Sequence, residues 1–140
     1  MGEQPSPNDL NGSKSADTLS LRAPAKLNIR LKVISRRTDG YHSLVSIMVP
    51  VDLEDTLDLR VTEGEGISIR TLGYPVPDNQ HNLVFQASKA FLSRTETRAG
   101  LRVTLNKKIP VAAGLGGGSS NAAAVLKGLN EIFSYPLSPD

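Results

Sequence analysis

The glycine-rich stretch over residues 114–118 is the feature of this sequence best suited to chemistry. Four of its five residues are glycine, and it leads into Ser119, Ser120 and a helix-forming segment. Glycine lets consecutive backbone N–H groups turn toward one point, and a following helix directs its positive end there. We expect one of the two serines to cap that helix when no ligand is bound. A plain turn with a serine cap needs only one or two glycines, so the stretch favours a phosphate-binding loop.

The residue order of this loop bears on two other nucleotide-binding motifs. A Walker A loop places Lys and then Ser or Thr after its last glycine, whereas Ser119 follows Gly118 here, so that class is excluded. The dinucleotide fingerprint needs a third glycine three residues after Gly116, and that position is again Ser119. The order of strands does not suit that motif either.

Two shorter segments carry side chains that could act on a phosphorylated ligand. Lys26 begins an alternating stretch, where a fixed positive charge could stabilise a phosphoryl group in transfer. Asn28, two residues on, faces the same side of a strand. Tyr41 and His42 follow the Asp39-Gly40 turn. Taken alone, such a lysine is more often a solvated surface residue, and Tyr41-His42 could equally be a packed turn.

The elements that position these residues follow from periodicity. Alternation of apolar and polar residues predicts strands over 19–21 and 27–33, and an apolar run predicts a more fully buried strand over 44–51. A turn at residues 37–40 joins these into a hairpin, and a turn at 64–66 joins strands 57–61 and 67–70 into a second. Four or five strands are thus expected before the first helix.

Two helices and one further strand complete the expected domain. Residues 73–82 predict a loop that ends in a helix cap at Asn82, with the helix continuing to about Arg94. Residues 101–105 alternate as a strand, and apolar residues from Ala122 to Phe133 mark one face of a second helix. This order predicts an α+β domain with a mixed or antiparallel sheet.

Composition narrows the class of protein. The chain has 140 residues, 39% of them hydrophobic, and no cysteine, which excludes disulfides and thiolate chemistry. Sixteen Lys and Arg against 14 Asp and Glu leave a net charge of +2, too small to indicate a nucleic-acid-binding surface. No apolar run is long enough to span a membrane and no secretory signal is seen, so we expect a cytoplasmic protein. Residues 1–18 predict a disordered tail before one domain over 19–140.

Three segments, over residues 24–28, 36–42 and 109–123, together resemble the GHMP kinase superfamily. The resemblance runs from about Leu19 to Asp140. It implies the N-terminal ATP-binding domain of that superfamily, an α+β fold shared with a ribosomal protein, with helices on one face of the sheet. The Asp-Gly-Tyr-His element narrows the resemblance to a member of non-mevalonate isoprenoid precursor biosynthesis. The implied reaction is transfer of the ATP γ-phosphate, with Mg²⁺, to the 2-hydroxyl of a cytidine-diphosphate-linked methylerythritol.

The resemblance also assigns roles to individual residues. Lys26 matches the catalytic lysine near the acceptor hydroxyl, and Asn28 lines the same pocket. Tyr41 and His42 match residues that hold the cytidine base. No protein ligand of a metal is assigned. The ATP phosphates are assigned to the loop residues Gly114, Leu115, Gly116, Gly117, Gly118, Ser119, Ser120 and Asn121.

One part of the superfamily pattern has no match in this sequence. Members are longer, and their catalytic aspartate lies downstream of the helix that follows the glycine loop. We therefore expect an apparently truncated chain, lacking the C-terminal domain and inactive alone. Its expected partners are the small-molecule substrate and either the missing C-terminal half or a second copy of itself. The absent domain should leave apolar surface exposed, chiefly on the helix over 121–133, and stability marginal.

Two other classes of function stay open at this point. A non-catalytic module that binds a nucleotide or another anion could use the same scaffold, because one fold hosts unrelated functions. Nucleic-acid binding is the third hypothesis, and the small net charge argues against it. The basic residues that it would use are Arg30, Lys32, Arg36, Arg37, Lys107 and Lys108.

Overall fold

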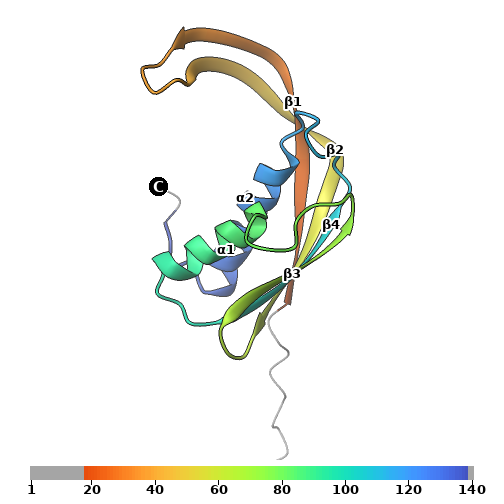
Figure 1. The fold of residues 1–140 in the computed structure, drawn as a ribbon, viewed down its shortest axis with the longest axis vertical. Coiled ribbons are helices and arrows are strands. Elements are labelled where there is room, and N and C mark those ends of the chain that lie inside the picture. The colour runs from red at the N-terminus through yellow and green to blue at the C-terminus, as the bar shows by residue number, and fades with distance from the viewer. Residues whose placement is uncertain (1–17, 139–140) are drawn as a thin grey trace, which may run out of the picture.

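The computed structural model describes residues 18–138, so the tail predicted for residues 1–18 lies outside them except for Thr18. The elements in chain order are β1 (Thr18–Arg36), β2 (His42–Thr62), β3 (Gly66–Gly73), α1 (Leu83–Arg94), β4 (Gly100–Lys107) and α2 (Gly117–Ile132). The strands form one mixed sheet of order β1-β2-β4-β3, and both helices cover the same face (Figure 1). The predicted α+β fold with helices on one face is confirmed. Neither helix in the described part of the chain has the length and apolar character needed to cross a bilayer.

The core lies between the sheet and the two helices. Alternate strand residues point into it, and each helix contributes one apolar face. The Phe91 ring of α1 stacks on the Phe133 ring just after α2, with ring centroids 6.1 Å apart. Each large side chain buried in this layer contributes about 1.5–3 kcal/mol, which holds the helices against the sheet. The buried residues include Ala23, Leu57, Leu59, Val84, Phe91, Leu101, Val103, Leu105, Val125 and Leu129.

The strand pairing differs from the second predicted hairpin. β2 and β3 do flank the turn at residues 64–66, but β4 lies between them, antiparallel to β2 and parallel to β3. β4 places Leu101, Val103 and Leu105 in the core, almost fully buried. β4 is the most buried of the described strands, because its central position gives it a neighbour on each edge as well as helices on its face. Within the described residues, three strands rather than four or five precede α1.

β1 and β2 continue past the rest of the sheet as a two-stranded arm, residues 26–50, which curves over the helix side (Figure 1). We call the remaining described residues the body. The hairpin predicted around residues 37–40 is confirmed. Register shifts between Asn28 and Arg30 and between Val33 and Ser35 leave an extra residue on β1, and such bulges bend a strand.

The burial predicted for residues 44–51 is wrong. The side chains of Leu44, Val45, Ile47 and Met48 are each more than half exposed. β4 pairs with β2 only from Thr56 to Thr62, so no third strand of the described residues lies beside the arm.

α2 is not the main uncovered element either. It buries Ala124, Val125 and Leu129 against the body, and Leu126 is its only exposed large hydrophobic residue within the described range. The exposed apolar surface lies chiefly on the arm, because the arm has neither a helix nor a further strand packed along it.

Candidate functional site

Residues 108–116 leave β4 and form the loop that leads into α2. Positive φ angles at Ala112, Gly114 and Gly116, of 58°, 72° and 70°, turn the chain back on itself. Gly116 is the N-cap of α2 in the left-handed conformation, without a side-chain cap. The predicted serine cap is therefore wrong. α2 begins at Gly117 rather than near Asn121, which places Ser119 and Ser120 inside its first turn.

The start of α2 presents unpaired backbone donors. The first bond of the helix runs from the Ser120 N–H to the Gly116 carbonyl oxygen, at 2.9 Å. The N–H groups of Gly117, Gly118 and Ser119 precede that bond and have no acceptor within the helix. The first turn contains no acidic residue, so no carboxylate there offsets the positive end of the helix dipole. This arrangement suits an anionic ligand, and a phosphate in particular.

A cleft of about 370 Å³ opens beside these donors. The loop from Pro110 to Ser119 forms one wall, and residues Val76, Pro77, His81 and Leu83 belong to the other. The predicted cap at Asn82 is confirmed, since Asn82 Oδ1 accepts the Val84 N–H at 2.8 Å. A cleft with apolar walls and convergent donors at one end has the form of a site for a nucleotide.

Asn121 supplies an independent sign that this cleft takes a ligand. The residue is buried, it lines the cleft, and its Oδ1 has no hydrogen-bond partner among the described residues. An unpaired buried carbonyl oxygen costs about 1–3 kcal/mol. A bound ligand or a water molecule that donates to Oδ1 would remove that cost.

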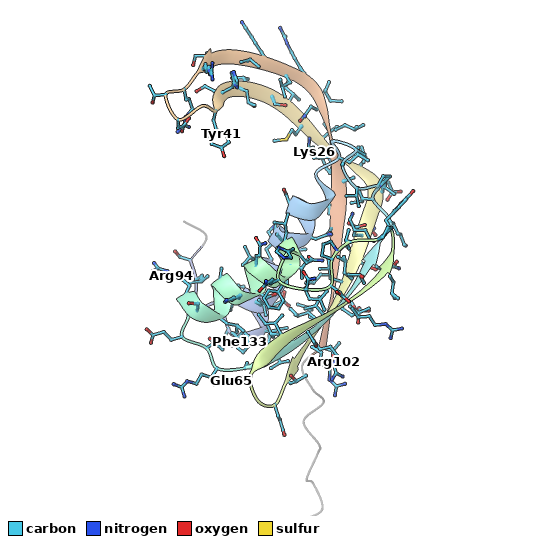
Figure 2. The ribbon with its side chains drawn as sticks, viewed as in Figure 1. Lys26, Tyr41, Glu65, Arg94, Arg102 and Phe133 are labelled. Atoms are coloured by element: carbon cyan, nitrogen blue, oxygen red, sulfur yellow. The ribbon has the colours of Figure 1, made fainter. Side chains whose placement is uncertain are left out.

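Lys26 lies on the other side of the loop, at the root of the arm (Figure 2). Its Nζ donates to the Gly114 carbonyl oxygen at 2.9 Å, and its backbone N–H donates to the Leu115 carbonyl oxygen at 3.0 Å. A Cβ on Gly116 would lie 3.1 Å from Lys26 Cε, so the lysine side chain packs directly on that glycine. The structure thus brings Lys26 and the glycine loop together, and the catalytic role of Lys26 stays a prediction.

Asn28, Tyr41 and His42 lie on the arm, Asn28 near its root and the other two at its tip. Asn28 Oδ1 accepts a hydrogen bond from Ser46 Oγ at 3.1 Å. Tyr41 lies at the arm tip, on its concave side (Figure 2). It is 74% exposed, so the alternative in which Tyr41 is packed within the turn is wrong. His42 begins β2 opposite Arg36 and is exposed. The structure therefore separates the predicted base-binding residues at the tip from Lys26 at the root.

Two charged residues beneath the loop were missed by the sequence analysis. Asp55 and Lys107 are 0% and 4% exposed, and Lys107 Nζ donates to Asp55 Oδ2 at 2.6 Å. Asp55 lies within β2, and Lys107 is too buried to join Lys108 in a basic surface. The alternation contained a signal, because Lys107 continues the buried series of residues 101, 103 and 105. A lysine on a buried face requires a partner.

The site offers few protein ligands for a metal. Within residues 18–138, no group of three or more His, Asp or Glu side chains could hold an ion. The Ser119 hydroxyl lines the cleft. A Mg²⁺ ion at this place would take its other ligands from phosphate oxygens and water, which is its common mode of binding beside nucleotides.

The fold and the loop are similar to those of a known class of protein. The family described as GHMP kinases N terminal domain matches residues 82–140, from the cap of α1 through α2. The structure is similar to that of a homoserine kinase from Cytophaga hutchinsonii, with a TM-score of 0.69 at 20% identity over 93% of this chain and 40% of that one. The described residues have the fold of a GHMP kinase N-terminal domain.

Within this class, the chain is similar to 4-diphosphocytidyl-2-C-methyl-D-erythritol kinases. Proteins of that name from Shouchella clausii and Geobacter sulfurreducens are 48% and 47% identical, over 86% and 85% of this chain. A crystal structure of 4-(cytidine 5'-diphospho)-2C-methyl-D-erythritol kinase matches with a TM-score of 0.73 at 36% identity, over 86% of this chain and 42% of that one. The chain spans 41% and 43% of the length of the two curated relatives.

Proposed function

We propose that this chain supplies the ATP-binding part of a kinase that phosphorylates the 2-hydroxyl of 4-diphosphocytidyl-2-C-methyl-D-erythritol, in the cytoplasm. One observation carries the proposal: Lys26 Nζ lies 2.9 Å from the Gly114 carbonyl, beside a cleft that ends at the unpaired N–H groups of α2. The named relatives support this substrate, because their identity to the chain extends over 121 and 119 residues and so includes the arm.

ATP occupies the cleft in this proposal. Its phosphates accept hydrogen bonds from the N–H groups of Gly117, Gly118 and Ser119, and its base lies between the apolar walls. Asn121 Oδ1 accepts a donor from the bound nucleotide or an associated water. Mg²⁺ accompanies the phosphates and offsets their negative charge.

Lys26 places its charge where the γ-phosphate meets the acceptor hydroxyl. Its Nζ is held by one neutral carbonyl, and a phosphate oxygen is the stronger acceptor for a charged donor. Because the Lys26 backbone stays bonded to Leu115, the side chain can exchange partners without moving β1. Asn28, two residues further along, lines the acceptor pocket.

Tyr41 and His42 hold the cytidine base at the arm tip. The exposed ring of Tyr41 offers a face for stacking, and the His42 imidazole can donate to or accept from a base edge. The arm thus selects the acceptor, and the body binds the phosphate donor.

A carboxylate that could take the hydroxyl proton is not part of the described cleft. Neither the cleft beside α2 nor the shallower hollow around Lys26 is lined by a carboxylate of the described residues. We therefore expect the chain by itself to bind nucleotide without turnover.

Isothermal titration with a non-hydrolysable ATP analogue and Mg²⁺ tests the proposal. Ser119→Asp is the informative variant, because it adds a negative charge at the donors, whereas a side chain at Gly117 would collide with Lys107 Nζ and Ile109. We expect binding by the unsubstituted chain and a loss of about tenfold or more in Ser119→Asp, since like charges repel at close range.

Ser93→Asp is the matched control, because it adds the same charge at the exposed end of α1, away from the cleft. It should bind the analogue as the unsubstituted chain does. The proposal is wrong if the folded chain does not bind the analogue, or if Ser119→Asp binds it equally well.

A further inference from the structure

The buried pair of Asp55 and Lys107 has no task in the function proposed above, yet it is tied to the glycine loop by several bonds. Lys107 Nζ donates to Asp55 Oδ2 at 2.6 Å and to the Ile109 carbonyl oxygen at 2.7 Å. Asp55 Oδ1 accepts the backbone N–H groups of Lys108 at 2.6 Å and Ile109 at 2.8 Å. The pair therefore holds Ile109 through both its N–H and its carbonyl group.

The sheet gives this pair a fixed base. Leu57 of β2 is paired with Leu105 of β4, so Asp55 and Lys107 are the next core-facing positions on the two neighbouring strands. Both strands are central in the described sheet, and Leu57 and Leu105 are fully buried. The loop that starts at Lys108 is thus anchored to the most rigid part of the body.

The first turn of α2 rests directly on this anchor. A Cβ on Gly117 would lie 2.8 Å from Lys107 Nζ and 3.0 Å from Ile109 Cγ2. Only glycine lets the helix approach the pair this closely. The position of Lys107 and Ile109 therefore sets how far the N–H groups of residues 117–119 stand above the sheet.

Stability alone is a poor reason for such a pair. Two charges lose their hydration on burial, and apolar residues of similar volume are often as stable or more so. Three hydrogen bonds from the pair are directed at one short stretch of loop, residues 108 and 109, and they point to placement of that stretch instead.

We propose that Asp55 and Lys107 are positioning residues, which fix the first N–H groups of α2 at the place where a phosphate is bound. This inference rests on the proposed function. Lys107 also lines the cleft, but it is only 4% exposed and its Nζ already donates to Asp55 and Ile109, so the pair acts through Ile109 and Gly117.

The first test needs no nucleotide. Asp55→Asn keeps the size of the side chain and one acceptor oxygen, but it removes the charge that holds Lys107. In the free chain we expect hydrogen exchange of the Ser120 amide, which closes the first turn of α2, to become at least tenfold faster, measured by NMR. Amides of β3 should not change, and unchanged Ser120 exchange would overturn the proposal.

Glu54→Gln is the matched control for this measurement. It neutralises Glu54, the carboxylate next to Asp55 on β2. The partner of Glu54 is the exposed Arg22, whose Nε lies 2.6 Å from Glu54 Oε1. The hydrogen bond and the charge of Glu54 raise the pKa of Arg22, but neither residue touches the loop. We expect no change in Ser120 exchange in this variant.

The second test is affinity for the ATP analogue with Mg²⁺. Asp55→Asn should bind at least tenfold more weakly, whereas Ile69→Ala, a core variant on β3, should melt at lower temperature with unchanged affinity. The double variant Asp55→Asn with Lys107→Met leaves no unpaired charge, so its melting temperature should recover while its affinity stays low. Recovery of both, or full affinity in Asp55→Asn, would overturn the proposal.

The two tests distinguish failure of the proposed function from failure of the positioning role. If the unsubstituted chain does not bind the analogue, the proposed function is wrong, and Ser120 exchange still decides whether the pair positions α2. If Asp55→Asn does not fold, the double variant takes its place in both measurements.

Discussion

β1 and β2 each run through two regions of the molecule, the body and the arm. The same alternation of apolar and polar residues is buried in the body and exposed in the arm. In the body, Ala23, Leu57 and Leu59 are fully buried under the helices. In the arm, Leu31 and Val33 follow the same alternation and are 50% and 53% exposed. Alternation of apolar and polar residues indicates that a segment is a strand. Whether its apolar face is covered depends on neighbours elsewhere in the chain.

The division between the two regions falls at a distinct irregularity. Pro24 is paired with Glu54 and Lys26 with Pro50, so one residue of β1 faces three of β2 between them. Neither proline can donate a backbone hydrogen bond to the ladder. Lys26 therefore stands where the body ends and the arm begins, between the proposed donor and acceptor sites.

Leucine truncation should show the largest difference between the two regions. Leu59→Ala removes a fully buried side chain from the body, and we expect it to lower the free energy of unfolding by about 3 kcal/mol. Leu31→Ala in the arm should change it by about 0.5 kcal/mol or less. Urea denaturation followed by circular dichroism measures both. Equal losses would mean that the arm is covered in solution.

Two glycines with similar φ angles sharpen the comparison next. Gly73 in the body and Gly40 at the arm tip have φ of 83° and 87°. Gly40→Ala should lower the free energy of unfolding by about 1 kcal/mol, because a Cβ there meets no neighbouring atom and only the left-handed backbone conformation disfavours it. Gly73→Ala should cost about 2–3 kcal/mol, since its Cβ would also collide with the Lys107 carbonyl oxygen. Denaturant midpoints of the two variants decide this.

Ligand binding should divide along the same boundary. Tyr41→Ala should weaken binding of cytidine 5′-diphosphate about tenfold, the value of one lost stacking contact. The ATP analogue should bind to Tyr41→Ala as tightly as to the unsubstituted chain, because the loop and α2 belong to the body. Tyr135→Ala, which removes another exposed tyrosine, serves as the control. Titration calorimetry with each ligand measures both affinities. Weaker binding of both ligands to Tyr41→Ala would contradict the division of binding between arm and body.

The smallest expected effect is weak self-association through the arm. Its exposed apolar side chains predict a sedimentation coefficient that rises with protein concentration. Ile47→Lys should reduce this rise, whereas Leu126→Lys on α2 should alter it less. A concentration-independent coefficient for the unsubstituted chain would show that the arm does not associate.

Local patterns predicted the elements of this fold well. The Asn82 cap, the turn at residues 37–40 and the α2 periodicity each depend on neighbouring residues, and the structure contains all three. The pairing of β3 does not depend on its neighbours in sequence. It depends on β4, which follows only after α1 and pairs Gly100 with Gly66, so the turn at 64–66 wrongly indicated a hairpin.

The candidate site was predictable to a similar degree. The glycine loop was recognisable by residue type and Lys26 only by the resemblance of its segment to a known superfamily, and the structure places the two together. The serine cap failed because Gly116 in the left-handed conformation takes the cap position, which residue types alone did not indicate. Asp55 and Lys107 were overlooked because their partnership crosses two strands that the predicted pairing did not join.

The bend at the root of the arm has a consequence for how such a protein diversifies. β1 runs eleven residues from Lys26 to Arg36, and a strand of that length reaches about 30 Å. A tilt of about 5° at the root displaces the end of a lever of that length by about 3 Å, while Lys26 and the loop hardly move. If the proposed function holds, substitutions at one end of a single hairpin can alter the acceptor site while the proposed ATP site stays in place.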